Sequence, residues 1–94
     1  MRMTDNAEWI EIDPERVLQT LDREAVDKVS SAPGEVVLDF SSVLRIDTNA
    51  VRALERLAGL AEGKSVRIVL RAINVDIYKV LKLLKLTGRF AFLN

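Results

Sequence analysis

Short runs typical of β-strands alternate along this chain with longer stretches typical of helices, and this order constrains the fold more than any other feature. The runs are Ala7–Ile12, Glu35–Phe40, Ser65–Leu70 and Phe90–Leu93, and valine and isoleucine are prominent in the first three. Between them, apolar residues recur three or four positions apart, which is the spacing of one helix face. The sequence therefore predicts the order β-α-β-α-β-α-β.

The expected helices cover Pro14–Ser31, Thr48–Ala61 and Asn74–Leu86. Asp13 is expected to cap the first helix, with Pro14 at its first position, because proline lacks the N–H that would be unpaired there. Asn74 is a suitable cap for the third helix. Gly63 and Gly88 are expected to end the second and third helices, since glycine is the usual residue beyond a helix C-terminus.

The connections are short, and strand–helix–strand units cross over in a right-handed sense. We therefore expect an α/β fold with a parallel sheet whose strands are adjacent in chain order. Residues 1–94 fit one domain, with residues 1–6 as a flexible N-terminus. The expected core includes Leu38, Leu54, Leu57, Ile68 and Leu81.

The composition excludes several classes of function. The chain has no cysteine and no histidine, which removes thiolate and imidazole chemistry and leaves only carboxylates as metal ligands. We expect no enzymatic activity, cofactor or metal. The 14 basic and 14 acidic residues balance, so no global positive field attracts nucleic acid. Because no apolar run is long enough to span a bilayer and no signal peptide is recognisable, we expect a cytoplasmic protein without membrane insertion.

Candidate site residues lie near the predicted carboxyl edge of the sheet, where ligands of open α/β sheets gather. Asp39 ends a central strand, and Asp47 precedes a helix on the same side. From spacing alone, Asp39 is expected to bond the following loop and Asp47 to cap the helix. Thr48 places a hydroxyl at a helix start, where the helix dipole favours added negative charge; it is either a plain N-cap or first-turn residue or a modification site.

A family resemblance rests on residues 36–54, which read V-V-L-D-F-S-S-V-L-R-I-D-T-N-A-V-R-A-L. This segment resembles the signature of STAS domains, which include the bacterial anti-sigma-factor antagonists. I-E-I-D at 10–13 and N-V-D-I-Y-K-V-L-K-L-L-K-L-T-G-R-F at 74–90 are also similar to that family. The resemblance implies the STAS fold, a right-handed βα superhelix with a mostly parallel four-stranded sheet.

The resemblance also implies a function. Asp39 and Asp47 match the family's two aspartates, and Thr48 matches its phosphorylated residue. The implied protein is an anti-sigma-factor antagonist that binds a serine/threonine kinase-type anti-sigma factor, or another ATPase, until Thr48 is phosphorylated. Asp39, Asp47, Thr48, Asn49 and Arg52 are the expected partner-binding residues. Threonine replaces the commoner serine, and Asn49-Ala50 replaces the Ser-Gly of many antagonists.

Other functions stay open at this point. The alternative is a STAS scaffold or accessory subunit of a stressosome or of an ABC-type lipid transporter ATPase. Binding of a small ligand at the same edge is ranked lowest, because no phosphate-binding loop is present. An exposed sheet edge and the Phe90–Phe92 end leave a homodimer open. Lys79, Lys82 and Lys85 form a basic stripe, which is expected to be a solvated face or a docking surface.

Overall fold

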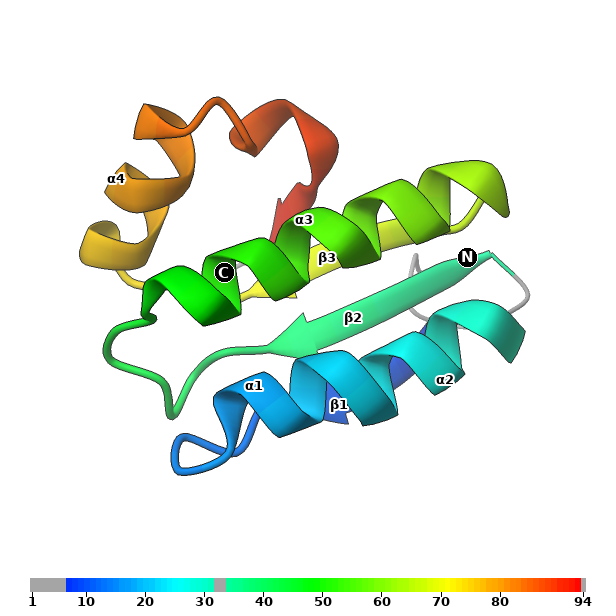
Figure 1. Cartoon of the computed structure of the whole chain (residues 1–94), viewed down its shortest axis with the longest axis horizontal. Coiled ribbons are helices and arrows are strands. Elements are labelled where there is room, and N and C mark those ends of the chain that lie inside the picture. Colours follow the sequence, from blue (N-terminus) through cyan, green and yellow to red (C-terminus); the bar gives the residue numbers. More distant parts are fainter. Residues whose placement is uncertain (1–6, 32–33, 94) are drawn as a thin grey trace.

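The computed structural model describes residues 7–31 and 34–93, so the flexibility expected of residues 1–6 lies outside the described residues. Four strands form one sheet: β1 (Ala7–Glu11), β2 (Glu35–Asp39), β3 (Arg67–Arg71) and β4 (Ala91–Leu93). They are all parallel and lie in the order β1-β2-β3-β4 (Figure 1). The predicted α/β class, strand order and parallel pairing are confirmed.

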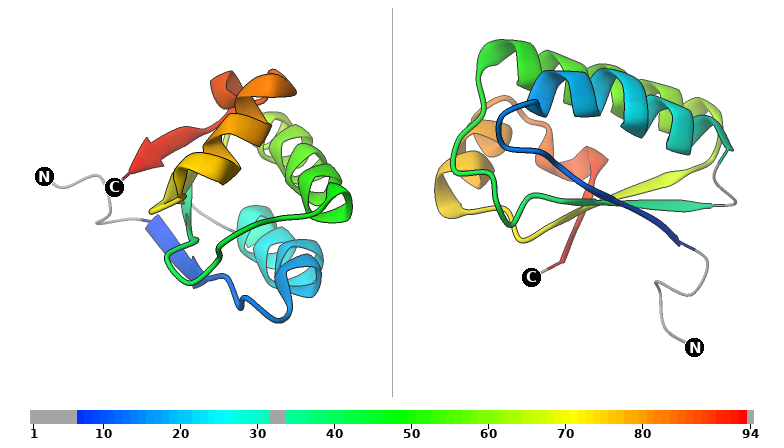
Figure 2. Two further views of the ribbon diagram at one scale, coloured as in Figure 1. Left: turned by 90° about the vertical axis from the view of Figure 1, so that its left-hand side faces the viewer. Right: turned by 90° about the horizontal axis from the view of Figure 1, so that it is seen from below.

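The helical stretches are α1 (Val17–Gln19), the π-helical turn η1 (Thr20–Glu24), α2 (Ala25–Ser31), α3 (Thr48–Gly63), α4 (Val75–Leu83) and the 3-10 turn η2 (Thr87–Arg89). Segments α1, η1 and α2 follow one another without a break and form one rod. That rod and α3 lie side by side over one face of the sheet, and α4 lies at one end of the molecule (Figures 1 and 2). The opposite face of the sheet carries no helix among the described residues.

The first helix begins later than predicted. The Asp13 side chain accepts a hydrogen bond from the Glu15 backbone N–H (2.9 Å), and the Asp13 carbonyl accepts one from the Arg16 N–H (3.0 Å). These bonds close a tight turn, so the helix starts only at Val17. The prediction that Pro14 occupies the first helical position is therefore wrong, because Asp13 stabilises a turn rather than a helix start.

Gly63 and Gly88, which were expected to end α3 and α4, do not form the left-handed turns that follow these helices. Ser65 (φ 57°) and Lys85 (φ 61°) adopt the left-handed conformation instead. After each of them, the next backbone N–H bonds back across the last helical turn, from Val66 to the Ala61 carbonyl and from Leu86 to the Leu81 carbonyl, both at 2.8 Å. As a result α4 ends at Leu83, three residues before the predicted end.

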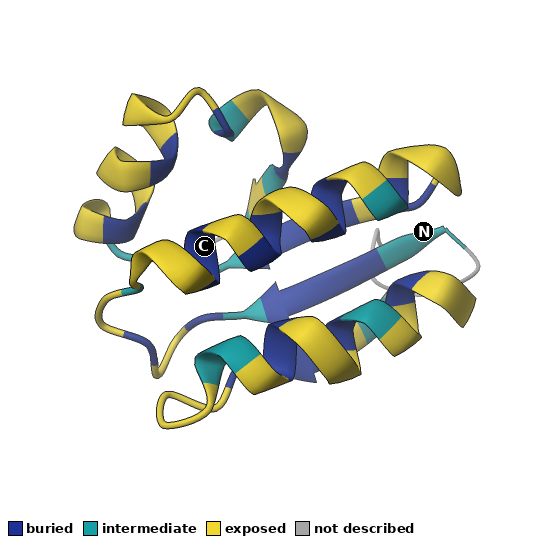
Figure 3. Ribbon diagram, viewed as in Figure 1, coloured by how far each residue is buried: buried dark blue, intermediate teal, exposed yellow. Residues whose placement is uncertain are grey.

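The core lies between the sheet and the helices (Figure 3). The five residues predicted for it, Leu38, Leu54, Leu57, Ile68 and Leu81, are all at most 2% exposed. Alternate strand residues point to opposite faces, and the register aligns Ile10, Leu38 and Leu70 on the helix-covered face. Phe90 was expected to belong to an exposed end of the sheet. This expectation is wrong, because Phe90 is buried in the same core.

Candidate functional site

The start of α3 is organised by Asp47. This residue has an extended backbone (φ −97°, ψ 179°), and its Oδ1 accepts a hydrogen bond from the Ala50 N–H at 2.8 Å. Its carbonyl accepts the first intrahelical bond, from the Val51 N–H at 3.0 Å. Asp47 is therefore the N-cap of α3, as the sequence predicted, and Thr48 is the first helical residue rather than the cap.

Thr48, Asn49 and Arg52 form the exposed outer side of the first turn of α3. Among the described residues, none of these three side chains takes part in a hydrogen bond or an ion pair. Residues three or four apart lie on the same helix face, so the Thr48 hydroxyl and the Arg52 guanidinium share one face. The backbone N–H groups of the first turn add partial positive charge beside the Thr48 hydroxyl.

Asp39 belongs to a different group of side chains. Its Oδ1 accepts hydrogen bonds from the Ser41 N–H at 2.9 Å and from Nη1 of Arg71 at 3.2 Å. Arg71 also lies over the Trp9 ring, 5.8 Å from its centroid. This contact reaches from β3 to β1 across β2, where Val37 is fully buried. Trp9, Asp39 and Arg71 therefore form a polar and aromatic cluster on the helix-free face of the sheet.

The charge of Asp39 is stabilised by its neighbours. Partial burial raises the pKa of this carboxyl, but the hydrogen bonds from Ser41 and the positive charge of Arg71 together outweigh burial and hold the pKa below its ordinary value. The carboxylate thus bonds the loop after β2, as expected from the sequence. Its partner on β3 was not foreseen.

The structure does not bring Asp39 and Asp47 into one site. Asp39 is the last residue of β2 and Asp47 follows that strand, so both lie toward the carboxyl edge of the sheet. Asp39 alternates with Leu38, whose side chain is in the core, and therefore points to the helix-free face. Asp47 caps α3 on the covered face. Of the predicted partner-binding residues, Asp47, Thr48, Asn49 and Arg52 form one surface, and Asp39 lies apart from it.

A hollow that the sequence did not predict adjoins this surface. It has a volume of about 420 Å³ and lies between the beginning of the first helical rod and the segment that leads into α3. Val17, Leu18, Arg45, Ile46 and Asp47 are among the residues that line it. A protein partner that covers the α3 start could therefore insert a side chain beside Asp47, against the apolar wall that Val17, Leu18 and Ile46 provide.

Within residues 7–31 and 34–93, no three carboxylates gather in the way needed to hold a metal ion. In the same residues, no helix is both long and apolar enough to cross a membrane.

The fold and the α3 surface define a small α/β domain, a right-handed βα superhelix with an exposed helix start at its carboxyl edge. The family follows from comparison with known proteins: the family model described as "Mlab, STAS domain" matches residues 11–93, so the chain belongs to the STAS domain family. The resemblance seen in the sequence is thereby confirmed. The comparison with curated proteins gives no match.

Several solved structures share the fold, and two of them are described here. One, from Thermotoga maritima, is provisionally assigned as an anti-sigma factor antagonist; the TM-score is 0.71 at 17% identity, over 95% of this chain and 74% of that one. The other is a sulfate transporter family protein from Wolinella succinogenes, with a TM-score of 0.77 at 19% identity, over 98% of this chain and 80% of that one. At these identities the likeness establishes the fold alone.

Proposed function

We propose that this protein is a regulatory binding module of the anti-sigma-factor-antagonist type, acting in the cytoplasm and without catalytic activity of its own. Unphosphorylated, it binds a kinase-type anti-sigma factor through the start of α3, and phosphorylation of Thr48 releases it. The observation that carries the proposal is the placement of Thr48. Its hydroxyl is exposed at the first position of a helix, beside the capping Asp47, in a family that contains such antagonists.

Phosphorylation at this position would change the surface without damaging the fold. A phosphate adds about −1.5 to −2 charges, and the positive end of the α3 dipole tolerates a negative group there. An interface fitted to a neutral hydroxyl next to the Asp47 carboxylate would, however, meet repulsion and a desolvation penalty. A hundredfold loss of affinity requires about 2.7 kcal/mol.

Arg52 supplies a second element of the proposed switch. It lies four residues after Thr48 on the same exposed face of α3 and pairs with no acidic group among the described residues. In the unphosphorylated protein its guanidinium is free to meet an acidic group of the partner. A phosphate on Thr48 would pair with Arg52 across one helical turn and so withdraw this cation from the partner.

Calorimetry against the purified partner kinase tests the proposal. Thr48→Ala should bind like the wild type, and Thr48→Glu should bind at least tenfold more weakly, which corresponds to about 1.4 kcal/mol. Ser30→Glu is the matched control, because it also replaces an exposed neutral hydroxyl side chain by a carboxylate, at the far end of the first helical rod, and should leave the affinity unchanged. Equal affinities for the Ala and Glu variants would contradict the role of Thr48.

A second function is favoured by one observation, the description of the matching family model as "Mlab, STAS domain". On this alternative, the chain is an accessory subunit of an ABC-type lipid transporter, and the same α3 surface docks permanently on the transporter ATPase. Purification of the complex from cells distinguishes the two functions. Nucleotide-dependent recovery of a kinase supports the antagonist, and stable recovery of a transporter ATPase, unaffected by Thr48→Glu, supports the subunit.

A further inference from the structure

Helix α4 exposes more apolar surface than its neighbours require. Ile77 and Leu81 are its buried residues, whereas Leu83 is 81% exposed, Val75 66% and Leu84 51%. The helix lies at one end of the molecule, and most of its surface is exposed (Figures 1 and 3). Isolated apolar residues on a surface are ordinary, but several on one short helix mark an interaction site.

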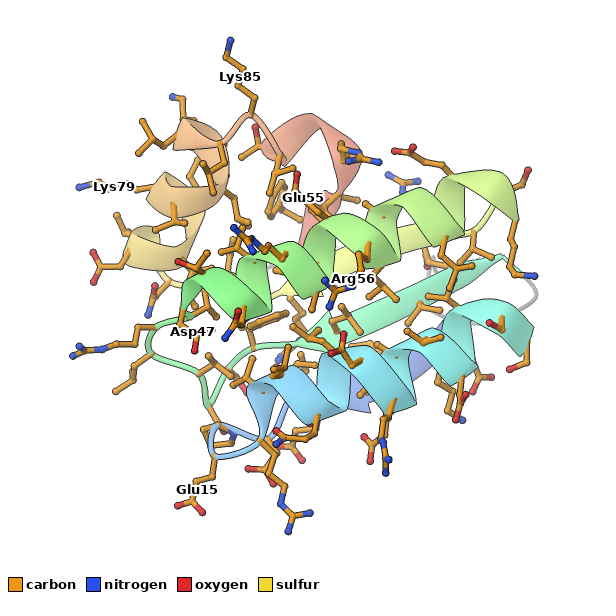
Figure 4. All side chains as sticks on the ribbon, viewed as in Figure 1. Glu15, Asp47, Glu55, Arg56, Lys79 and Lys85 are labelled. Carbon is orange, nitrogen blue, oxygen red and sulfur yellow. The ribbon has the colours of Figure 1, made fainter. Side chains whose placement is uncertain are left out.

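Lysines accompany these apolar side chains. Lys79, Lys82 and Lys85 are exposed, and none forms an ion pair with a described residue. Lys79 and Lys85 point away from the body of the molecule (Figure 4). Asp76 is the only acidic residue in α4. We refer to Val75, Lys79, Lys82, Leu83, Leu84 and Lys85 as the α4 patch; it combines three positive charges with three exposed apolar side chains.

We propose that the α4 patch binds the surface of an anionic lipid bilayer. The leucines and Val75 would enter the boundary between headgroups and acyl chains, and the lysine ammonium groups would meet the lipid phosphates. Binding of a helix to a bilayer surface grows with the apolar area that it buries there and with the attraction of its lysines to anionic lipids, and the α4 patch offers both. Long lysine side chains can lay their methylene stems along the apolar region while the charged ends stay in water.

The shape and the charge of the patch favour a bilayer over a protein partner. The apolar side chains project individually between lysines on an outward-facing helix. A protein partner would need a matching pocket for each of them to achieve the packing of an interface core, whereas a fluid lipid boundary needs none. The chain as a whole has a net charge of zero, so attraction to anionic lipid must come from this local cluster and act at short range.

This proposal concerns a peripheral contact, separate from the Thr48 surface, and it does not depend on the proposed function. A single spectroscopic probe can locate the contact, because the chain contains one tryptophan, Trp9, on the helix-free face of the sheet. In a Trp9→Phe background, Leu83→Trp moves the probe into the patch. Lys64→Trp in the same background is the control, at the far end of α3.

With vesicles of phosphatidylglycerol and phosphatidylcholine in equal parts, the probe at position 83 should shift its emission to the blue and be quenched by brominated acyl chains. The probe at position 64 should do neither, and vesicles of phosphatidylcholine alone should shift neither probe. The shift at position 83 should decline with added salt, because salt screens exposed charges. No shift at position 83, or equal shifts at both positions, would overturn the proposal.

Charge removal gives a second, independent measurement. The triple variant Lys79→Gln, Lys82→Gln, Lys85→Gln should lower partition into the anionic vesicles about a hundredfold, from about fivefold for each lysine, while its thermal unfolding stays cooperative. The control is a second triple variant that removes the same charge elsewhere, with the substitutions Arg16→Gln, Arg23→Gln and Lys64→Gln. It should partition like the wild type. Equal partition of the two triple variants would overturn the proposal. So would binding of polyglutamate without binding of the vesicles, which would favour an acidic protein instead.

Discussion

The side chain of Asn74 joins the start of α4 to the segment that precedes α3, because its Nδ2 donates a hydrogen bond to the Leu44 carbonyl at 2.7 Å. Its Oδ1 accepts another from the Ile77 N–H at 2.9 Å, which makes Asn74 the N-cap of α4. One amide thus satisfies a helix end and positions the chain four residues before Thr48. Leu44 itself is 76% exposed, so this bond fixes the backbone of a surface loop.

Two substitutions at Asn74 should separate its two roles. Asn74→Asp keeps a capping oxygen but loses the donor to Leu44, whereas Asn74→Ala loses both. We expect Asn74→Ala to lower the free energy of unfolding by about 1 to 2 kcal/mol and Asn74→Asp by about half as much. Urea unfolding gives both values. Equal losses would mean that the capping bond from the Ile77 N–H contributes no stability, and no loss in Asn74→Asp would mean the same of the bond to Leu44.

The Asp39–Arg71 pair predicts a dependence of stability on pH. The pKa of Asp39 is lowered in the folded protein. The contribution of its carboxylate to the free energy of unfolding is therefore complete above the unfolded-state pKa of about 3.9. It declines as the pH falls through that value and on through the lower folded-state pKa. We therefore expect Asp39→Asn to cost about 1 kcal/mol at neutral pH and progressively less below about pH 4.

Urea unfolding at a series of pH values measures how the stabilities of the wild type and Asp39→Asn approach each other in acid. Arg71→Gln serves as the companion variant, because it removes the cation and leaves the carboxylate. Its free energy of unfolding should also fall less steeply in acid than that of the wild type. In the double variant the two losses should not add, since both remove the same contact. Parallel curves for the wild type and Asp39→Asn across the acid range would contradict the assignment.

The sequence predicted the sheet well because the alternation of strands and helices is local and the crossovers have one hand. It predicted helix ends less well. Asp13 carries the residue type of an N-cap, yet its carboxylate bonds the Glu15 N–H two positions on and closes a turn. The left-handed backbone at Ser65 and Lys85 has no sequence signal, because serine and lysine seldom adopt that conformation.

In the candidate site, too, some features could be predicted from the sequence and others could not. Asp47 could be recognised as a cap from its position just before an apolar helix face, and Thr48 follows from that assignment. The partner of Asp39 could not be recognised, because Arg71 becomes its neighbour only through the register of β2 with β3, over 32 positions of the chain. The sheet face on which Asp39 lies could have been predicted, because neighbouring strand residues point to opposite faces and Leu38 was expected in the core.

A core substitution tests the packing of α3 against the sheet. Leu57 is 1% exposed, and Leu57→Ala should lower the free energy of unfolding by about 2 to 5 kcal/mol through lost burial and a residual cavity. Leu83→Ala makes the same chemical change at an 81% exposed position on α4 and should stay within about 0.5 kcal/mol of the wild type. Similar losses in the two variants would show that α3 is packed differently.

The assignment of Asp47 as the cap of α3 leads to a prediction about Thr48 that can be checked without any partner. Asp47→Ala should cost about 1 kcal/mol, because the Ala50 N–H loses its acceptor. Thr48→Ala should cost less than about 0.5 kcal/mol, since the Thr48 side chain bonds to no described residue.

Thr48→Glu should be at least as stable as Thr48→Ala, because a carboxylate in the first turn interacts favourably with the helix dipole by about 0.3 to 1 kcal/mol, offset in part by repulsion from Asp47. Thermal and urea unfolding of the three variants measure these differences, and added salt should reduce the benefit of the glutamate. The order matters for the proposed switch. If Thr48→Glu folds as stably as Thr48→Ala, its loss of partner binding must arise at the interface. If Thr48→Glu unfolds much more readily, a negative group at this position acts by disrupting α3, and the proposed release mechanism is wrong.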